Sequence, residues 1–170
     1  MINVSNVLSG AGSIENEVPY GFDTVEVFGR TFPIVGNDGI HYTLTRLSKE
    51  EIQVHFTTHL EVKIPCDRCL TDVTRQFDLE FDDKVSFQDL EENEDIKSGY
   101  VIGYNLDMDK LVYDEILVNW PDKVLCSEDC KGVCGSCGKN LNLGTCDCQD
   151  AGPDLRMAVI RDIFKDYKEV

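Results

Sequence analysis

The fold is decided by residues 52–70, which have the sequence IQVHFTTHLEVKIPCDRCL. Side chains at even and odd positions differ in kind along residues 52–64. The even positions are mainly apolar (Ile52, Val54, Phe56, Thr58, Leu60, Val62 and Ile64), and the odd positions are polar (Gln53, His55, Thr57, His59, Glu61 and Lys63). Because successive side chains of a strand point to opposite faces, this period of two predicts a strand with one buried face.

The alternation resumes on the far side of the Cys66-Asp67-Arg68-Cys69 segment. Its apolar residues there are Val73, Phe77, Leu79 and Phe81, all at odd positions. Two such strands joined by a short connection predict a long antiparallel hairpin with the Cys-x-x-Cys at its tip. Pro65 fits this arrangement, since a strand end needs no ladder hydrogen bond from its nitrogen.

The rest of the chain predicts an α+β fold with a mainly antiparallel sheet and two principal helices. Residues 25–35 favour strand, and residues 36–39 have the composition of a turn. Asp107 can cap a first helix that runs to about Trp120, and a second helix starts at Pro153. We therefore expect an irregular arm over 1–22, a sheet plus helix over 23–125, a cysteine module over 126–152 and a C-terminal helix over 153–170 that packs back on the core.

Cysteines predict metal binding near the C-terminus. The eight cysteines are Cys66, Cys69, Cys126, Cys130, Cys134, Cys137, Cys146 and Cys148. Eight thiols complete two tetrahedral sulfur sites, and a Cys-x-x-Cys supplies two ligands from one tight turn. We pair Cys134 and Cys137 with Cys146 and Cys148, and the remaining four with one another. A single zinc with spare buried thiols and an iron–sulfur centre stay open as alternatives.

Charge and composition narrow the function. The 170 residues carry 16 basic and 32 acidic side chains, a formal charge of −16. Two Zn²⁺ ions held by eight thiolates would bring this to about −20. Such a field repels phosphate backbones, so a nucleic-acid contact must be local or made through a basic protein. The N-terminus does not resemble a signal peptide and no apolar run could span a bilayer, so we expect a cytoplasmic protein that keeps its thiols reduced.

No catalytic motif is present, and we expect the protein not to be an enzyme. His55 and His59 lie on the polar face of the predicted strand and are interpreted as surface residues rather than ligands. The acidic run over 78–95 is either a solvated edge or a docking surface for a basic protein. Four cations near the cysteine turns are candidates for RNA contact, or else they balance the thiolates: Lys63, Arg68, Lys131 and Lys139.

Three segments together resemble the YceD family, bacterial and plastid proteins linked to large-subunit ribosomal RNA accumulation. They are residues 64–70, the helix 111–120 and residues 126–142, the last including the Gly138-Lys139-Asn140-Leu141-Asn142 sequence. The exit Trp120-Pro121-Asp122-Lys123 departs mildly from the family pattern. The resemblance implies a zinc-binding factor in ribosome biogenesis whose partners are ribosomal RNA or a basic ribosomal protein. A thiol-based redox sensor and a transcription-linked zinc adaptor are the alternatives.

Overall fold

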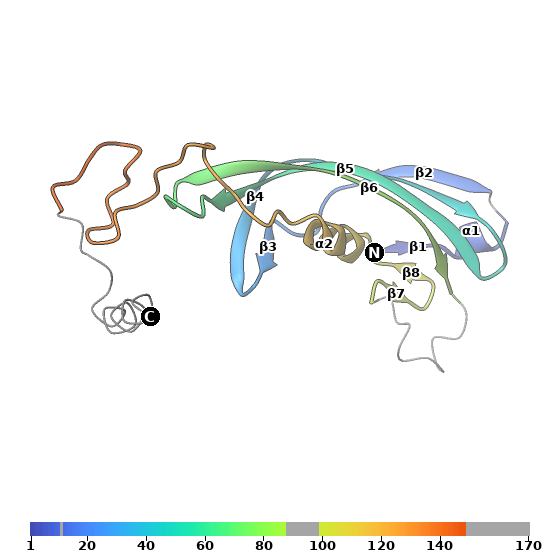
Figure 1. The fold of residues 1–170 in the computed structure, drawn as a ribbon. Coiled ribbons are helices and arrows are strands. Elements are labelled where there is room, and N and C mark those ends of the chain that lie inside the picture. The colour runs from blue at the N-terminus through green and yellow to red at the C-terminus, as the bar shows by residue number, and fades with distance from the viewer. Residues whose placement is uncertain (11, 88–98, 149–170) are drawn as a thin grey trace, which may run out of the picture. The chain divides into compact units, whose positions relative to one another are not determined.

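A long hairpin organises the computed structural model, which describes residues 1–10, 12–87 and 99–148. Its two strands are β5 (Glu51–Pro65) and β6 (Asp72–Ser86), and the Cys66–Cys69 segment lies in the connection between them (Figure 1). Every even position from Ile52 to Ile64 is buried, and none of the odd positions between them is. The predicted hairpin and the predicted phase of its buried face are therefore confirmed.

The hairpin forms part of a five-stranded sheet with the order β2-β4-β5-β6. Strand β4 (Arg30–Arg46) pairs antiparallel with β5 and with the edge strand β2 (Ser13–Val18). The short strand β3 (Thr24–Val27) pairs with β4 away from this path. The described part of the chain is thus mainly antiparallel sheet, as the sequence predicted.

Two local predictions are wrong. Residues 36–39 do not turn the chain, because β4 continues through them with register shifts between Ile34 and Gly36 and between Asn37 and Ile40. The chain reverses earlier, at Phe28 and Gly29, where φ is 51° and 73°. Residues 1–22 are not an irregular arm either. They contain β1 (Ile2–Asn3), the short helix α1 (Ser5–Leu8) and β2, whose exposed acids hide its alternation.

The second described helix, α2 (Met108–Val118), begins where the sequence predicted. The side chain of Asp107 accepts a hydrogen bond from the backbone N–H of Lys110, which satisfies one of the free donors of the first turn. A small antiparallel sheet precedes the helix, formed by β1, β8 (Asn105–Leu106) and β7 (Val101–Ile102). Helix α2 buries Met108, Leu111, Val112 and Ile116, whereas Leu117 is exposed.

The chain divides into two compact units. The first consists of residues 1–64 and 72–124 and holds both sheets and both described helices. The second consists of residues 65–71 and 125–170 and holds all the cysteines. The predicted C-terminal helix over 153–170 lies outside the described residues. Within the described ranges, no helix is long and apolar enough to cross a membrane.

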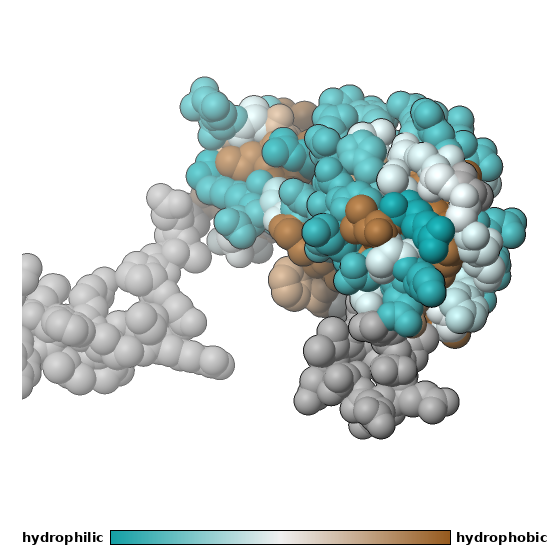
Figure 2. Space-filling view, turned by 90° about the vertical axis from the view of Figure 1, so that its right-hand side faces the viewer, coloured by the Kyte–Doolittle hydropathy of each residue, from teal (hydrophilic) through white to brown (hydrophobic). Residues whose placement is uncertain are grey.

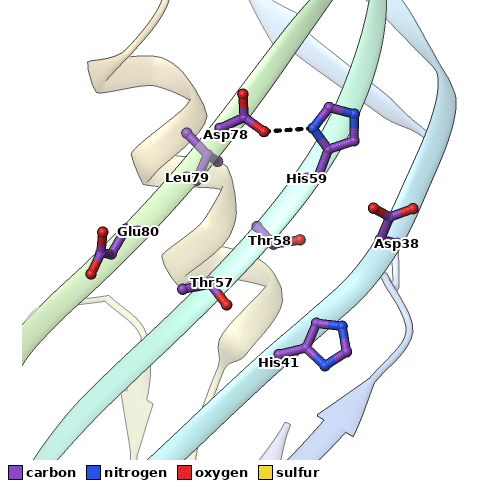
Figure 3. A pocket seen from close by; sticks show the side chains of 8 residues that line it. All are labelled: Asp38, His41, Thr57, Thr58, His59, Asp78, Leu79 and Glu80. Atoms are coloured by element: carbon purple, nitrogen blue, oxygen red, sulfur yellow. Dashed lines mark hydrogen bonds and ion pairs between the residues drawn. The ribbon is translucent and has the colours of Figure 1, made fainter.

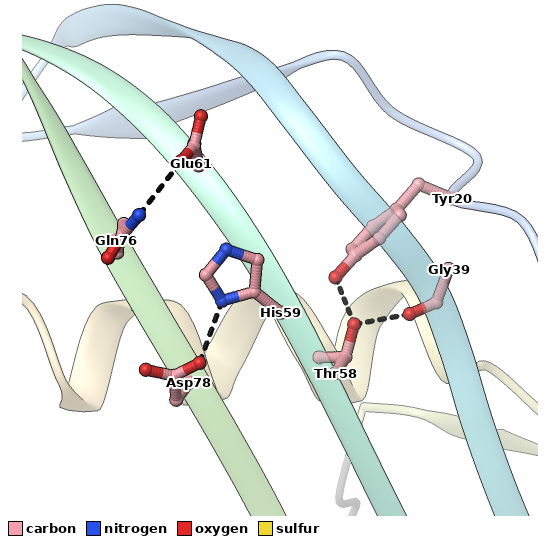
Figure 4. Close-up of polar contacts among 7 residues, drawn as sticks. All are labelled: Tyr20, Gly39, Thr58, His59, Glu61, Gln76 and Asp78. Carbon is pink, nitrogen blue, oxygen red and sulfur yellow. Dashed lines mark hydrogen bonds and ion pairs between the residues drawn. The ribbon is translucent and has the colours of Figure 1, made fainter.

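A hydrogen-bonded chain explains why Thr58 stands among apolar residues on the buried face of β5. The Thr58 hydroxyl donates to the carbonyl of Gly39 at 2.5 Å, inside the irregular stretch of β4 (Figure 4). Since its one hydrogen is used there, Thr58 accepts from the hydroxyl of Tyr20. Burial raises the pKa of Tyr20, which keeps that phenol protonated as a donor. Thr58 therefore satisfies a carbonyl that the bulge takes out of the ladder.

We expect Thr58→Val to destabilise the first unit by about 1–3 kcal/mol, because it leaves buried polar groups without a partner while keeping the side-chain volume. The measurement is the free energy of unfolding by denaturant. Thr57→Val is the matched control, as Thr57 is the exposed neighbour on the other face of the same strand. Equal stability of the two variants would contradict a structural role for the Thr58 hydroxyl.

Candidate metal centres

Two turns of the second unit share one backbone design. In the first, the N–H of Leu70 donates to the carbonyl of Cys66 at 2.9 Å, and in the second, Gly138 donates to Cys134 at 2.9 Å. Leu70 and Gly138 both have positive φ, 59° and 73°. Each turn therefore closes around a Cys-x-x-Cys in the same way, and both are built to aim two sulfurs and several N–H groups at one point.

The first sulfur group consists of Cys66, Cys69, Cys126 and Cys130, whose Sγ atoms all lie within 4.8 Å of one another. The Cys66 and Cys130 sulfurs are 3.8 Å apart, and those of Cys69 and Cys126 are 3.4 Å apart. Four thiolates at about 2.3 Å from a zinc ion have sulfur separations of roughly 4 Å. Only Cys126 is exposed, so this group fits a buried tetrahedral metal site.

The second sulfur group consists of Cys134, Cys137, Cys146 and Cys148, again within 4.8 Å of one another. Its scaffold is a narrow loop in which Cys134 donates to the carbonyl of Lys139 at 2.8 Å and Val133 bridges Asn140. Cys137 and Cys148 are exposed, and Cys134 and Cys146 are half-buried. The structure thus brings the eight sulfurs together in the pairing that the sequence predicted, with the second group more open to solvent than the first.

Local hydrogen bonds lower the pKa of two thiols in the first group, Cys66 and Cys69, and of Cys134 in the second. Burial raises the pKa of the Cys66 thiol, but the backbone N–H groups of Arg68, Cys69 and Cys126 outweigh it and lower the pKa to about 6. Hydrogen bonds from the backbone of Cys137 and Ser136 lower the pKa of Cys134 to about 6. Such N–H groups favour the thiolate, which is the form that binds metal.

Crowding by neighbouring thiols has the opposite effect on the pKa of Cys126 and Cys148. The neighbouring Cys69 and Cys130 side chains raise the pKa of Cys126 to about 12, and Cys137 raises the pKa of Cys148 to about 12. Four adjacent thiols therefore cannot all ionise by themselves, because each thiolate opposes the next. A divalent cation at the centre of each group reverses this repulsion, since all four negative charges then face a positive one.

An amide network supports the first sulfur group, and sequence reasoning missed it. The Asn142 amide donates to Cys130 Sγ at 3.3 Å while its oxygen accepts the N–H of Lys131 at 2.8 Å. Asn140 donates to the Thr71 hydroxyl, which lies 3.3 Å from Cys69 Sγ. The signal was the Gly138–Asn142 sequence, whose two asparagines follow the second Cys-x-x-Cys yet serve the first sulfur group.

Two of the four candidate RNA-contacting cations hold the backbone of the cysteine unit. The Arg68 guanidinium donates to the carbonyl of Cys130 at 3.0 Å, and Lys139 Nζ donates to the carbonyl of Thr145 at 2.6 Å. Lys131 is exposed and Lys63 lies on the polar face of β5; neither side chain has a hydrogen bond or ion pair to the described residues. The geometry gives Arg68 and Lys139 a structural task that the sequence did not reveal.

A second candidate site is a shallow hollow of about 390 Å³ on the polar face of the main sheet (Figure 3). His59 Nδ1 lies 2.7 Å from Asp78 Oδ1 across the β5–β6 pair, and this hydrogen bond raises the pKa of His59. His41 and Asp38 also line the hollow. Among the described residues, no third metal-binding side chain converges on His59 and Asp78. The pair is a surface contact, as the sequence favoured.

Comparison with known proteins agrees with these motifs. The family model "Large ribosomal RNA subunit accumulation protein YceD" matches residues 54–164, which include both sulfur groups. The Bacillus subtilis (strain 168) protein described as "Uncharacterized protein YlbN" is 26% identical over 124 residues, 72% of either chain. No solved structure matches the chain significantly. Since the family model covers most of the long hairpin, helix α2 and all eight cysteines, the chain belongs to the YceD family.

Proposed function

We propose that this protein is a non-enzymatic, zinc-binding factor that acts in the cytoplasm in assembly of the large ribosomal subunit. The observation that carries the proposal is the convergence of all eight cysteine sulfurs into two groups of four, in a family named for large ribosomal RNA subunit accumulation. A site with four protein ligands leaves no open position for a substrate, which is typical of structural rather than catalytic zinc.

Zinc would hold the second unit together. Its described segments, residues 65–71 and 125–148, contain no helix or strand beyond the end of β5, and Val133, Leu143 and Leu70 are exposed. Loops of this kind bury little apolar surface, so metal–thiolate bonds would supply the folding energy that a core otherwise gives. The ions would fix the two turns and, with them, the surface that the unit offers to partners.

The partner we propose is a basic ribosomal protein bound on the polar face of the main sheet. Residues Asp78, Glu80 and Asp82 are exposed on β6, at the start of the acidic run over 78–95. Figure 2 shows one face of the molecule on which hydrophilic side chains predominate and apolar ones gather in separate areas. Opposite charges would speed the encounter and fix its orientation. Lys63 and Lys131 would add local contacts to RNA. Arg68 and Lys139, in or beside the cysteine turns, would add positive charge near these contacts.

A redox sensor is the second candidate, favoured by the exposure of Cys137 and Cys148 in the second sulfur group. Exposed thiolates are the ones that oxidants reach first. Titration with hydrogen peroxide separates the two functions. A sensor would release zinc at low oxidant with a change of shape, whereas an assembly factor would keep its zinc until oxidant is in large excess.

Metal analysis of the purified protein should give two zinc ions per chain. We expect Cys134→Ser to retain one ion and Cys66→Ser to retain the other, because each removes one of four ligands from a different group. Structural zinc in small modules contributes roughly 10–16 kcal/mol, so either variant should also lower thermal stability. Ser136→Ala, inside the second turn, is the control that keeps both ions. One zinc in the unaltered protein would refute the two-site model, and iron would refute zinc.

The amide network gives a finer test of the first site. Asn142→Asp replaces an N–H donor near Cys130 Sγ with a negative oxygen, so we expect zinc affinity at the first group to fall about 10–100-fold. Competition with a chromophoric chelator measures this, in a Cys134→Ser background that isolates the first group. Asn37→Asp is the control: Asn37 is an exposed residue of β4 in the other unit, so the same added charge should leave zinc affinity unchanged. An unchanged affinity in Asn142→Asp would rule out its supporting role.

Partner binding should depend on the acidic sheet face. We expect weak binding to bare ribosomal RNA at physiological salt with a shallow salt dependence, because few cations are available to replace counterions. Binding should strengthen when a basic large-subunit protein is added. The double variant Glu80→Lys, Asp82→Lys should abolish that gain, and Asp122→Lys, Glu128→Lys should preserve it. Tight binding to RNA alone with a steep salt slope would contradict the proposed electrostatics.

A further inference from the structure

Phe28 is placed at the tip of the β3–β4 hairpin in a way that the fold itself does not need. It is 96% exposed, and its φ of 51° lies in the left-handed region that bulky residues avoid. Gly29 beside it has φ 73°, so both residues of the two-residue turn have positive φ. Turns of this kind favour Asn-Gly or Gly-Gly, in which no large side chain is strained.

The hairpin below this tip is firmly held. Val25, Val27 and Phe32 are buried, and the ring of Phe32 lies 5.1 Å from that of Trp120. The hydroxyl of Tyr113 accepts from the N–H of Glu26 at 3.0 Å and donates to its carbonyl at 2.8 Å, so helix α2 holds the backbone of β3 at Glu26. In Figure 1 the hairpin bends away from the long strands of the main sheet. Phe28 is therefore presented from a fixed base.

The surroundings of Phe28 define what it could bind. Its exposed neighbours Glu26, Arg30 and Thr31 are polar, so the apolar surface at the tip is one aromatic ring. The Arg30 side chain has no hydrogen bond or ion pair to the described residues. One exposed aromatic ring, two residues before a guanidinium that has no partner among the described residues, matches the combination of one flat unpaired base and the phosphate beside it.

We propose that Phe28 stacks on an unpaired base of single-stranded RNA while Arg30 contacts the adjacent phosphate. This deepens the proposed function, on which it rests, by naming the residues and the RNA conformation that they recognise. Stacking suits a protein of charge −16, because it needs no broad basic surface. The strain at Phe28 fits the same purpose, since unfavourable backbone conformations persist where a functional side chain must be held in place.

The test uses the full-length protein with Phe28→Trp, whose indole reports stacking by loss of fluorescence. A 12-nucleotide single-stranded RNA of mixed sequence should quench it, and the duplex with its complement should not, because its bases are already stacked. Val118→Trp is the matched control, since Val118 is 80% exposed at the end of α2 and should show no quenching. Equal quenching of both variants, or of both by the duplex, would overturn the proposal.

Binding of the same RNA then separates stacking from charge. Phe28→Ala should lower affinity at least tenfold, and Arg30→Gln should reduce the salt slope by about 0.7. Phe28→Asn should raise the melting temperature by about 2–4 °C because asparagine tolerates positive φ, while losing the RNA contact. Unchanged affinity in Phe28→Ala would refute stacking. Loss of a ribosomal-protein contact instead would assign the ring to a protein pocket and also refute it.

The zinc content and the binding of a basic ribosomal protein report on the proposed function separately. If Phe28→Ala keeps two zinc ions and the protein partner but binds RNA as tightly as before, only the inference on Phe28 fails. If the unaltered protein binds neither partner, the proposed function fails as well.

Discussion

The register of β5 is the constraint on which the other features depend. A shift of one residue would turn Phe56, Leu60 and the rest of the buried row to solvent and bring His55 and His59 into the core. The free-energy cost of such a slip is large because every apolar side chain of the buried row would be exposed at once. The register also fixes where the strand ends, and therefore which residues form the turn that contains Cys66 and Cys69.

The second unit depends on a different balance. Repulsion between neighbouring thiolates is opposed by backbone N–H donors and, in our proposal, by a bound cation. Backbone N–H groups lower the pKa of Cys66 and Cys134, while their sulfur neighbours raise the pKa of Cys126 and Cys148. The fold thus assembles four thiols in each group that oppose one another's ionisation, and a positive charge at the centre would favour the thiolate form of all four. Asn142 and Thr71 add hydrogen bonds to the first group alone, consistent with its deeper burial.

Two residues other than glycine have positive φ in the described chain, and the two backbone conformations have different causes. Leu70 occupies the place that Gly138 takes in the other Cys-x-x-Cys turn, so closure of the metal turn accounts for its backbone. Phe28 closes a hairpin that other residues would close with less strain. Both side chains are exposed, 68% and 96%, and only the one at Phe28 lacks an explanation inside the molecule.

The sequence by itself determined the elements that rest on local pattern. Period-two alternation gave β5 and β6, Asp107 gave the start of α2, and cysteine spacing gave both sulfur groups, because each of these signals is contained in a few neighbouring residues. Tertiary structure decided what depends on distant partners. The 36–39 segment stays in β4 because Thr58 satisfies Gly39, and residues 13–18 become a strand because β4 offers an edge. Arg68 and Asn142 acquire their tasks only when Cys130 comes close to both of them in the folded chain, which no local pattern can specify.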